Sequence, residues 1–315
     1  MTTIDQICQH LAEIAPLRLA ESWDNVGLLI GDRRAAARRI LTCLTITPDV
    51  VDEAIREKVD LIVSHHPLPF KPLGKLTTDS TASGLVWKLC GAGIAVYSAH
   101  TAYDSAVGGI NDQWCEGLGL RDVRPLIPVS GPPGSRDCGS GGGEAGKKSS
   151  RDAGPAAVGE GSGRYGDRDQ PVAAKEFLRD AARWCESTRP RMIGDPDRPV
   201  RRVGVACGSG GSFLAAARRH GCDALVTGEA TFHTCLEAEN TGLSLFLVGH
   251  HASEWFAMRR MAETLNERLG WTRLTNDDPP PKVSGGSAGD AEPSWVRASV
   301  ADRDPITVDP VSPNP

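Results

Sequence analysis

The sequence predicts an α/β protein of two similar α/β domains, each with a mainly parallel or mixed sheet covered by helices. Two observations support this prediction. Short β-rich apolar runs alternate with helical segments in both halves of the chain, and a glycine-rich stretch separates the halves. Such alternation is typical of sheets that helices cover on both faces.

Residues 1–130 form the predicted first domain. It opens with a helix over residues 2–16, where Thr3 and Gln6 are spaced as a capping box and Pro16 ends the helix. The loop from Trp23 to Gly31 leads into a strand, with a buried tryptophan and an Asx turn as its simplest explanation. Further strands are predicted at 40–46, 60–64 and 94–97, and helices at 48–58, 80–90 and 109–118.

The second half has the same layout as the first. Residues 171–281 form the predicted second domain, with helices at 173–186, 213–220, 230–239 and 253–269 and strands at 200–206, 224–226 and 243–248. Between the domains, residues 131–170 hold 12 of the 35 glycines and lack hydrophobic periodicity, which predicts a flexible Gly/Ser-rich linker. Residues 282–315 are predicted to be a disordered Pro-rich tail.

Charge and composition exclude several classes of protein. The net charge is -5, with 35 basic and 40 acidic residues, so a nucleic-acid partner is disfavoured. The nine cysteines are scattered without a C-x-x-C pair or a secretory leader, which predicts reduced thiols in a cytoplasmic protein. No apolar run approaches the ~20 residues that a membrane span needs.

Histidines and carboxylates follow three of the predicted strands. His65 and His66 follow the strand at 60–64, His100 and Asp104 follow the strand at 94–97, and His250 and Glu254 follow the strand at 243–248. The carboxyl ends of parallel strands meet at one edge of a sheet, where ligands bind. Imidazole and carboxylate groups suit divalent transition metals, and this many donors fits a two-metal site with ions roughly 3.5–4 Å apart.

Three neighbouring features each leave two interpretations open. The turn Gly208–Gly211 is either a phosphate-binding turn or a plain tight turn. Glu229 is either a helix N-terminal residue or a carboxylate that orients a metal ligand. His251 stands beside His250 and is an alternative ligand.

Six motifs in order resemble the Ngg-one-interacting-factor-three-like family, whose members are also catalogued as GTP cyclohydrolase I type II homologues. They are Trp23-Asp24-Asn25-x-Gly27-Leu28, His65-His66-Pro67, His100-Thr101-x-x-Asp104, Gly208-x-Gly210-Gly211, Thr227-Gly228-Glu229 with His233, and Gly249-His250-x-x-Ser253-Glu254. The resemblance covers residues 1–128 and 171–281. It implies two similar α/β domains around a dinuclear metal centre, assembled as a toroidal hexamer.

The resemblance also implies roles for individual residues. His65 and His250 would bind one metal, His66 and Asp104 the other, and Glu254 would bridge both. His100 would line the site as an acid/base group or as a support for the ligands. The cofactors would be two divalent ions of zinc, manganese, iron, cobalt or nickel.

These expectations lead to a function hypothesis. Two such ions activate water for attack on a carbonyl, formamide-like or phosphoryl group. We therefore expect a metal-dependent hydrolase that acts on a nucleotide or another phosphorylated small molecule. The rival hypotheses are a non-catalytic metal-handling protein, a regulatory scaffold, and a structural metal site that joins two domains.

Overall fold

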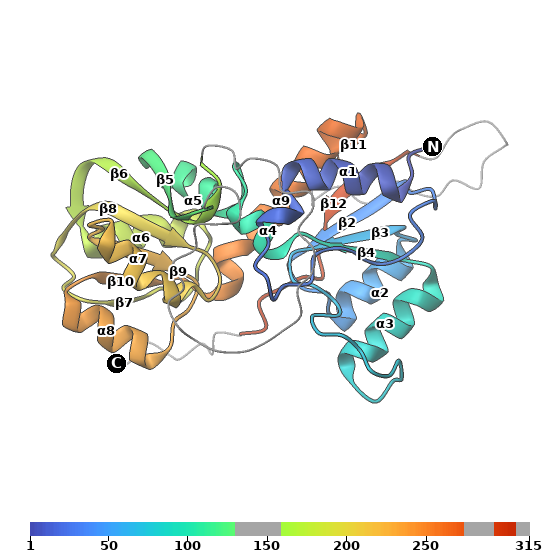
Figure 1. Cartoon of the computed structure of the whole chain (residues 1–315), viewed down its shortest axis with the longest axis horizontal. Helices are drawn as coiled ribbons and strands as arrows, with labels where there is room; N and C mark the ends of the chain where they lie inside the picture. The colour runs from blue at the N-terminus through green and yellow to red at the C-terminus, as the bar shows by residue number, and fades with distance from the viewer. Residues whose placement is uncertain (130–158, 274–292, 307–315) are drawn as a thin grey trace, which may run out of the picture.

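The structure is a computed structural model that describes residues 1–129, 159–273 and 293–306. Two lobes lie side by side in Figure 1, each built on its own six-stranded sheet. Helix α9 (His250–Leu269) runs through the region between them. The predicted fold class, mixed α/β with two sheets covered by helices, is confirmed.

The first sheet has the strand order β1-β4-β3-β2-β12-β11. Only β1 is antiparallel to its neighbour, so the carboxyl ends of the other strands point the same way. The strands are β1 (Gly27–Ile30), β2 (Arg39–Cys43), β3 (Leu61–Ser64), β4 (Ala95–Ser98), β11 (Thr272–Arg273) and β12 (Trp295–Ala298).

Helices cover both faces of this sheet. Successive side chains of a strand point to opposite faces of the sheet, so both faces of β2 carry apolar side chains. Ile40 packs into one apolar cluster, and Leu41 packs into another. The cluster on one face includes α1 (Ile4–Ile14) and α9, and that on the other includes α2 (Pro48–Arg56) and α3 (Thr81–Ala92). The predicted capping box of Thr3 and Gln6 is present.

The second sheet has the strand order β5-β6-β8-β9-β10-β7. Its centre, β8 to β10, is parallel, whereas β5, β6 and β7 pair antiparallel. The strands are β5 (Arg121–Pro128), β6 (Gly161–Ala173), β7 (Arg191–Ile193), β8 (Pro199–Ala206), β9 (Ala224–Thr227) and β10 (Ser244–Leu247). Its helices are α6 (Ala174–Trp184), α7 (Leu214–Arg219) and α8 (Phe232–Thr241).

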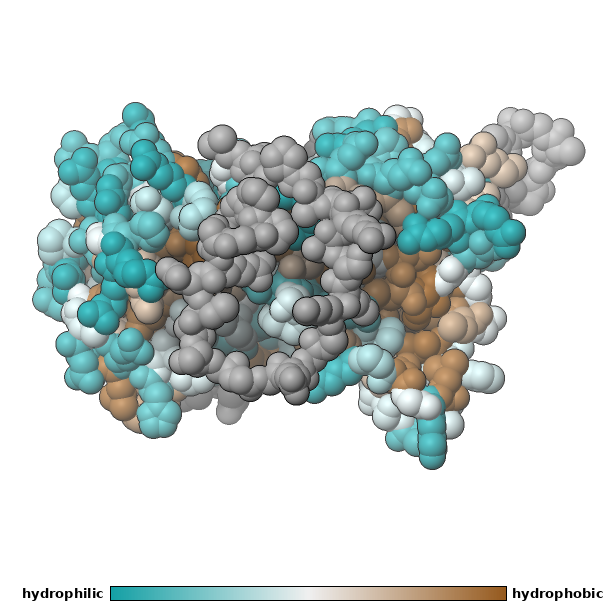
Figure 2. All heavy atoms as spheres, in the orientation of Figure 1, coloured by the Kyte–Doolittle hydropathy of each residue, from teal (hydrophilic) through white to brown (hydrophobic). Residues whose placement is uncertain are grey.

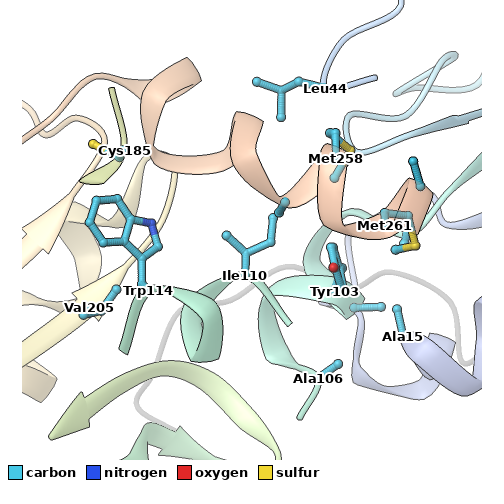
Figure 3. Packing of buried hydrophobic residues seen from close by; sticks show 14 of the residues in the cluster. Ala15, Leu44, Tyr103, Ala106, Ile110, Trp114, Cys185, Val205, Met258 and Met261 are labelled. Atoms are coloured by element: carbon cyan, nitrogen blue, oxygen red, sulfur yellow. The ribbon is translucent and has the colours of Figure 1, made fainter. Parts of the chain in front are cut away.

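One apolar core joins the two lobes. The short helix α5 (Ile110–Gly117) packs beside α9, and α4 (His100–Ser105) packs against α5 and the 3-10 turn η1 (Leu17–Leu19). The 3-10 turn η2 (Gly210–Phe213) lies beside β8 and α7. Figure 3 shows Trp114 of α5 and Met258 of α9 in this core. The Trp114 indole Nε1–H donates to the Ser253 carbonyl at 2.8 Å, which fixes α5 against the start of α9.

The predicted linker at 131–170 is wrong at its carboxyl end, because residues 161–170 belong to strand β6. The glycines there serve close strand packing. A Cβ on Gly161 would lie 2.4 Å from the Ile127 carbonyl oxygen, and a Cβ on Gly166 would lie 2.8 Å from that of Arg121. Residues 131–158 of the predicted linker lie outside the described residues.

The predicted tail at 282–315 is also wrong in part, because β12 is a buried strand inside the first sheet. The positive charge of Arg297 in this strand is neutralised. Its guanidinium, which is 3% exposed, donates to the carboxylates of Glu53 on α2 and of Glu57, which follows α2. The Asn266 side chain bonds both the N–H and the carbonyl of Val296. Residues 282–292 and 307–315 lie outside the described residues.

The chain enters and leaves the second lobe once. It leaves the first lobe after α5, builds the second sheet from β5 to β10, and returns with α9, which packs against β2 and β12. The predicted second domain at 171–281 therefore starts too late and ends too late. Within the described residues, no helix is long and apolar enough to cross a membrane.

Candidate metal centre

Strand ends bring the predicted metal ligands together. His65 and His66 follow β3, and Asp104 lies on α4, which begins directly after β4. His250 and Glu254 lie in the first turns of α9, which follows β10 of the other sheet. All five side chains meet between the lobes, as the contacts below show.

Glu254 lies at the centre of this group and is 3% exposed. Its Oε1 is 3.7 Å from His65 Nε2, whereas its Oε2 is 3.3 Å from His66 Nε2 and 3.1 Å from His250 Nε2. His250 and Glu254 face each other because residues four apart share one face of a helix. The two carboxylate oxygens thus point to different histidines.

Two further distances show which side chains are neighbours around these oxygens. His65 Nε2 lies 3.7 Å from Asp104 Oδ1, and His66 Nε2 lies 3.3 Å from His250 Nε2. Asp104 therefore lies beside His65, and His250 lies beside His66. Which of these residues share an ion stays a prediction. Two overlapping groups of donor atoms, which share His66, could hold a metal ion: His66, His250 and Glu254, and His65, His66 and His100.

His251 is not part of either group. Its ring stacks on Trp255 with centroids 5.6 Å apart, one helical turn along α9. His250 is the residue that meets Glu254 and His66, so the alternative ligand is not favoured by the geometry.

Two histidines of the centre have their second ring nitrogen held. His250 Nδ1 donates to Glu229 Oε1 at 2.9 Å, and the same oxygen accepts from Ser209 Oγ at 2.7 Å. His66 Nδ1 lies 2.7 Å from Thr45 Oγ1. Such contacts fix ring orientation and leave Nε2 facing the site, so Glu229 orients a candidate ligand.

His100 is held by a buried carboxylate. Its Nδ1 lies 2.7 Å from Asp24 Oδ1, and Asp24 Oδ2 accepts hydrogen bonds from the Thr101 N–H and hydroxyl. His100 also has a positive φ of 31°, an uncommon conformation for a residue with a side chain. Strained backbone of this kind gathers at functional sites.

The glycine turn after β8 lets the second lobe approach Glu254. A Cβ on Gly208 would lie 2.3 Å from Glu254 Oε1, and its φ of +61° also favours glycine. The N–H of Gly208 donates to Ser253 Oγ and that of Gly210 to Thr227 Oγ1. Because these N–H groups are already used, the contacts favour the tight turn over the phosphate-binding turn.

Burial and opposed charges set the protonation of the centre. Burial raises the pKa of Asp104, and the Glu254 carboxylate raises the pKa of His250 to about 9. Burial works against ionisation of Glu254, yet the facing histidines His65, His250 and His66 outweigh it and hold its pKa well below the usual value. The centre is thus built to keep a negative charge on Glu254.

Three residues that support the candidate centre were not predicted from the sequence. Cys207 Sγ donates to Asp104 Oδ1 at 3.2 Å, and Asn111 Oδ1 accepts from the Cys207 N–H at 3.0 Å. Asp24, which holds His100, was predicted only as part of an Asx turn and of the first family motif. The carboxylate of Asp24 beside Trp23 was the one sequence signal, because a carboxylate that becomes buried needs a hydrogen-bond partner. That partner, His100, lies 76 residues away and could not be identified from the motif.

The centre opens into a pocket of about 730 Å³ between the lobes. Both lobes line it, with Trp23, Phe70 and His100 on one side and Gly208, Ser212 and Phe213 on the other. A volume of this size accommodates a small organic molecule. The candidate metal ligands His66, Asp104, His250 and Glu254 also line the pocket, so a bound molecule reaches them.

The residues fit a metal ion. His65 is 1% exposed, yet neither of its ring nitrogens has a hydrogen-bond partner of acceptable geometry, and Glu254 Oε2 also lacks one. Each buried polar atom without a hydrogen-bond partner lowers stability by about 1–3 kcal/mol. A cation bound among these atoms would remove that cost. Imidazole and carboxylate are suitable donors for such an ion.

The fold and the donor cluster define a class of protein: a two-lobed α/β protein with a candidate metal centre between its lobes. Comparison with known proteins identifies the family. The family model for Duf34/NIF3 (NGG1p interacting factor 3) matches residues 2–276. The chain therefore belongs to the Duf34/NIF3 family.

Relatives and solved structures agree with this assignment. The GTP cyclohydrolase 1 type 2 homolog of Clostridium acetobutylicum is 31% identical over 266 residues, covering 84% of this chain and 90% of that protein. NIF3-like protein 1 of Drosophila melanogaster is 31% identical, covering 83% of this chain and 82% of that protein. A Bacillus cereus protein related to NIF3 has the same fold, with a TM-score of 0.77, 22% identity, and coverage of 98% of this chain and 99% of that one.

Proposed function

We propose that this protein is a metal-dependent hydrolase with a dinuclear centre. The observation that carries the proposal is the position of Glu254, whose two oxygens face different histidines. Oε1 faces His65, and Oε2 faces His66 and His250. A buried carboxylate with donors on both sides suits two ions that share it as a bridge.

The expected chemistry is hydrolysis of a polarised bond. When bound, two divalent ions supply Lewis-acid chemistry: they polarise a carbonyl or phosphoryl group and make water acidic enough to attack it near neutral pH. The chain itself holds the substrate in the pocket and orients the ligands through Glu229 and Thr45. His100, held by Asp24, lies where it can accept or return a proton.

Nucleotides and other phosphorylated small molecules are the proposed substrates. The printed names of several relatives, GTP cyclohydrolase 1 type 2 homolog, support a nucleotide. The pocket volume and its open connection to the candidate ligands support a small molecule rather than a polymer. The expected cytoplasmic location and the hexameric assembly stay predictions.

Metal analysis and turnover together test the proposal. Purified protein reloaded with zinc, manganese, iron, cobalt or nickel should hold two equivalents, and at least one metal form should hydrolyse a member of a nucleotide and phosphoester panel. Glu254→Ala should lose both metal and turnover. Less than one equivalent in the wild type refutes the dinuclear centre, and equal turnover in Glu254→Ala refutes the hydrolase.

A further inference from the structure

Two aromatic side chains stand open to solvent at the metal pocket. Trp23, which the sequence predicted to be buried, is 60% exposed, so that prediction is wrong. Phe70 is 45% exposed, and both residues line the pocket. Large aromatic side chains gain most when their faces are covered, and exposed ones beside a cavity mark a binding surface. These two rings are not needed for the core, which lies on other elements.

The rings form an ordered group with His100. The centroids of Trp23 and Phe70 are 6.0 Å apart with their planes at 62°, so the rings meet edge to face. The His100 ring lies 6.0 Å from Trp23 and 6.2 Å from Phe70, again edge to face. Edge contacts hold the rings in place and leave ring faces available to a third partner.

Hydrogen bonds fix the two loops that carry these rings. The Asn25 side-chain amide donates to the Pro69 carbonyl at 2.7 Å, which joins the Trp23 loop to the Phe70 loop. The Asp24 N–H donates to the Glu21 carbonyl at 3.0 Å, and its side chain holds His100. The aromatic surface is therefore arranged before a ligand arrives, which reduces the ordering cost of binding.

The surroundings favour a nitrogen heteroaromatic ring over a purely apolar one. Glu21 and Ser212 also line the pocket, and their side chains add hydrogen-bonding groups to its wall. Indole is rich in π electrons and stacks well on the electron-poor faces of nucleobase-like rings, whose edges carry N–H donors and acceptors. A simple hydrocarbon ring would make no hydrogen bonds with those polar groups.

We propose that Trp23 and Phe70 form a subsite that stacks a planar nitrogen-heteroaromatic ring of the substrate beside His100 and the candidate metal ligands. This inference rests on the proposed function for the identity of the site, and it narrows the substrate class. Phosphorylated molecules without such a ring would be poor ligands. Nucleosides and nucleobases themselves would bind.

The test measures binding in metal-free protein, so its outcome does not depend on turnover or on metal loading. The probes are guanosine, adenosine and cytidine, with ribose 5-phosphate and inorganic phosphate as ring-free probes. Binding is followed by calorimetry and by the indole N–H resonance of Trp23, which its variants assign. We expect the ring-bearing probes to bind at least about tenfold more tightly than ribose 5-phosphate.

Variants separate stacking from general hydrophobicity. Trp23→Leu should weaken nucleoside binding at least about tenfold, whereas Trp23→Phe, which keeps an aromatic face, should stay within about threefold of the wild type. Trp87→Leu is the matched control: Trp87 on α3 is 57% exposed but does not line the pocket. Figure 2 shows apolar surface over α2 and α3, the elements around this control position. Trp87→Leu should bind like the wild type.

Three outcomes would overturn the subsite. Ring-free probes that bind as tightly as nucleosides would remove the stacking argument, and so would equal losses in Trp23→Leu and Trp87→Leu. A Trp23 indole signal that changes with protein concentration and not with nucleoside would assign this surface to a second copy of the chain. Absence of turnover in the metal-loaded protein, with nucleoside binding intact, would count against the hydrolase and leave the subsite supported.

Discussion

Glu229 Oε1 lies 2.9 Å from His250 Nδ1, and the two residues follow the neighbouring parallel strands β9 and β10. The register of two strands in the second sheet therefore sets the orientation of a candidate ligand that faces the first lobe. Sheet pairing and metal binding are linked through this one contact.

Glu229→Gln should weaken metal binding about 10–100-fold, because an amide holds the imidazole less firmly than a carboxylate. Competition against a chromophoric chelator measures the change in affinity. Glu237→Gln on α8 is the control, since Glu237 is exposed and away from the pocket. Equal affinities for both variants and the wild type would show that Glu229 does not orient the ligand.

Gly208→Ala should remove metal binding, because its Cβ would lie 2.3 Å from Glu254 Oε1. Gly221→Ala is a matched control: its φ of +68° is close to the +61° of Gly208, but nothing lies within 4 Å of its Cβ position. Both variants should lose about 1 kcal/mol of unfolding free energy from backbone strain. Denaturant unfolding and metal analysis separate strain from displacement of Glu254, and normal metal content in Gly208→Ala would contradict the prediction.

The stability of the metal-free protein should fall as pH rises toward 9. Glu254 raises the pKa of His250 from 6.5 to about 9, so protonated His250 stabilises the folded state. This contribution is fully present below pH 6.5 and is lost as pH rises through about 9. Urea midpoints measured from pH 6 to 9.5 should show the decline, and His250→Gln should reduce it. If the stability of His250→Gln falls by the same amount, titratable groups other than His250 cause the decline.

Metal affinity should change with pH in the opposite direction. A proton on His250 competes with a metal ion for the same nitrogen, so affinity should rise between about pH 6.5 and 9. Chelator competition at a series of pH values gives the slope. A flat profile would show that His250 does not bind the metal.

Asp24→Asn should lower turnover and leave metal content unchanged. The substitution removes the charge that holds the His100 ring, while the ligands around Glu254 keep their contacts. Weakening the buried contacts to His100 and Thr101 should also cost about 1–3 kcal/mol of stability. Steady-state kinetics beside metal analysis test this, and loss of metal in Asp24→Asn would place His100 among the ligands.

Much of the site was predictable because its chemistry follows from local sequence. His65 and His66 directly follow an apolar run, and strand ends in α/β proteins gather at one edge. His250 and Glu254 are four residues apart, the spacing that puts two side chains on one face of a helix. Their grouping was not predictable, since it depends on how α9 crosses from one sheet to the other.

The errors in the fold have a common cause. Strand β6 is rich in glycine, a composition that resembles a flexible segment. Gly161 and Gly166 are nevertheless required in the strand, because a neighbouring backbone approaches too closely for a Cβ. In β12, Arg297 makes a buried strand look polar, and its partners Glu53 and Glu57 lie far away in sequence. Local patterns do not contain these long-range contacts.

The return of the chain to the first lobe has a consequence for synthesis. Strand β12 lies between β2 and β11, so the first sheet is completed only by residues near the carboxyl end. The second sheet, from β5 to β10, is continuous in sequence and can pair while the ribosome still makes α9. His65 and Asp104 thus emerge before Glu254, so the candidate metal centre cannot be complete until α9 has been made.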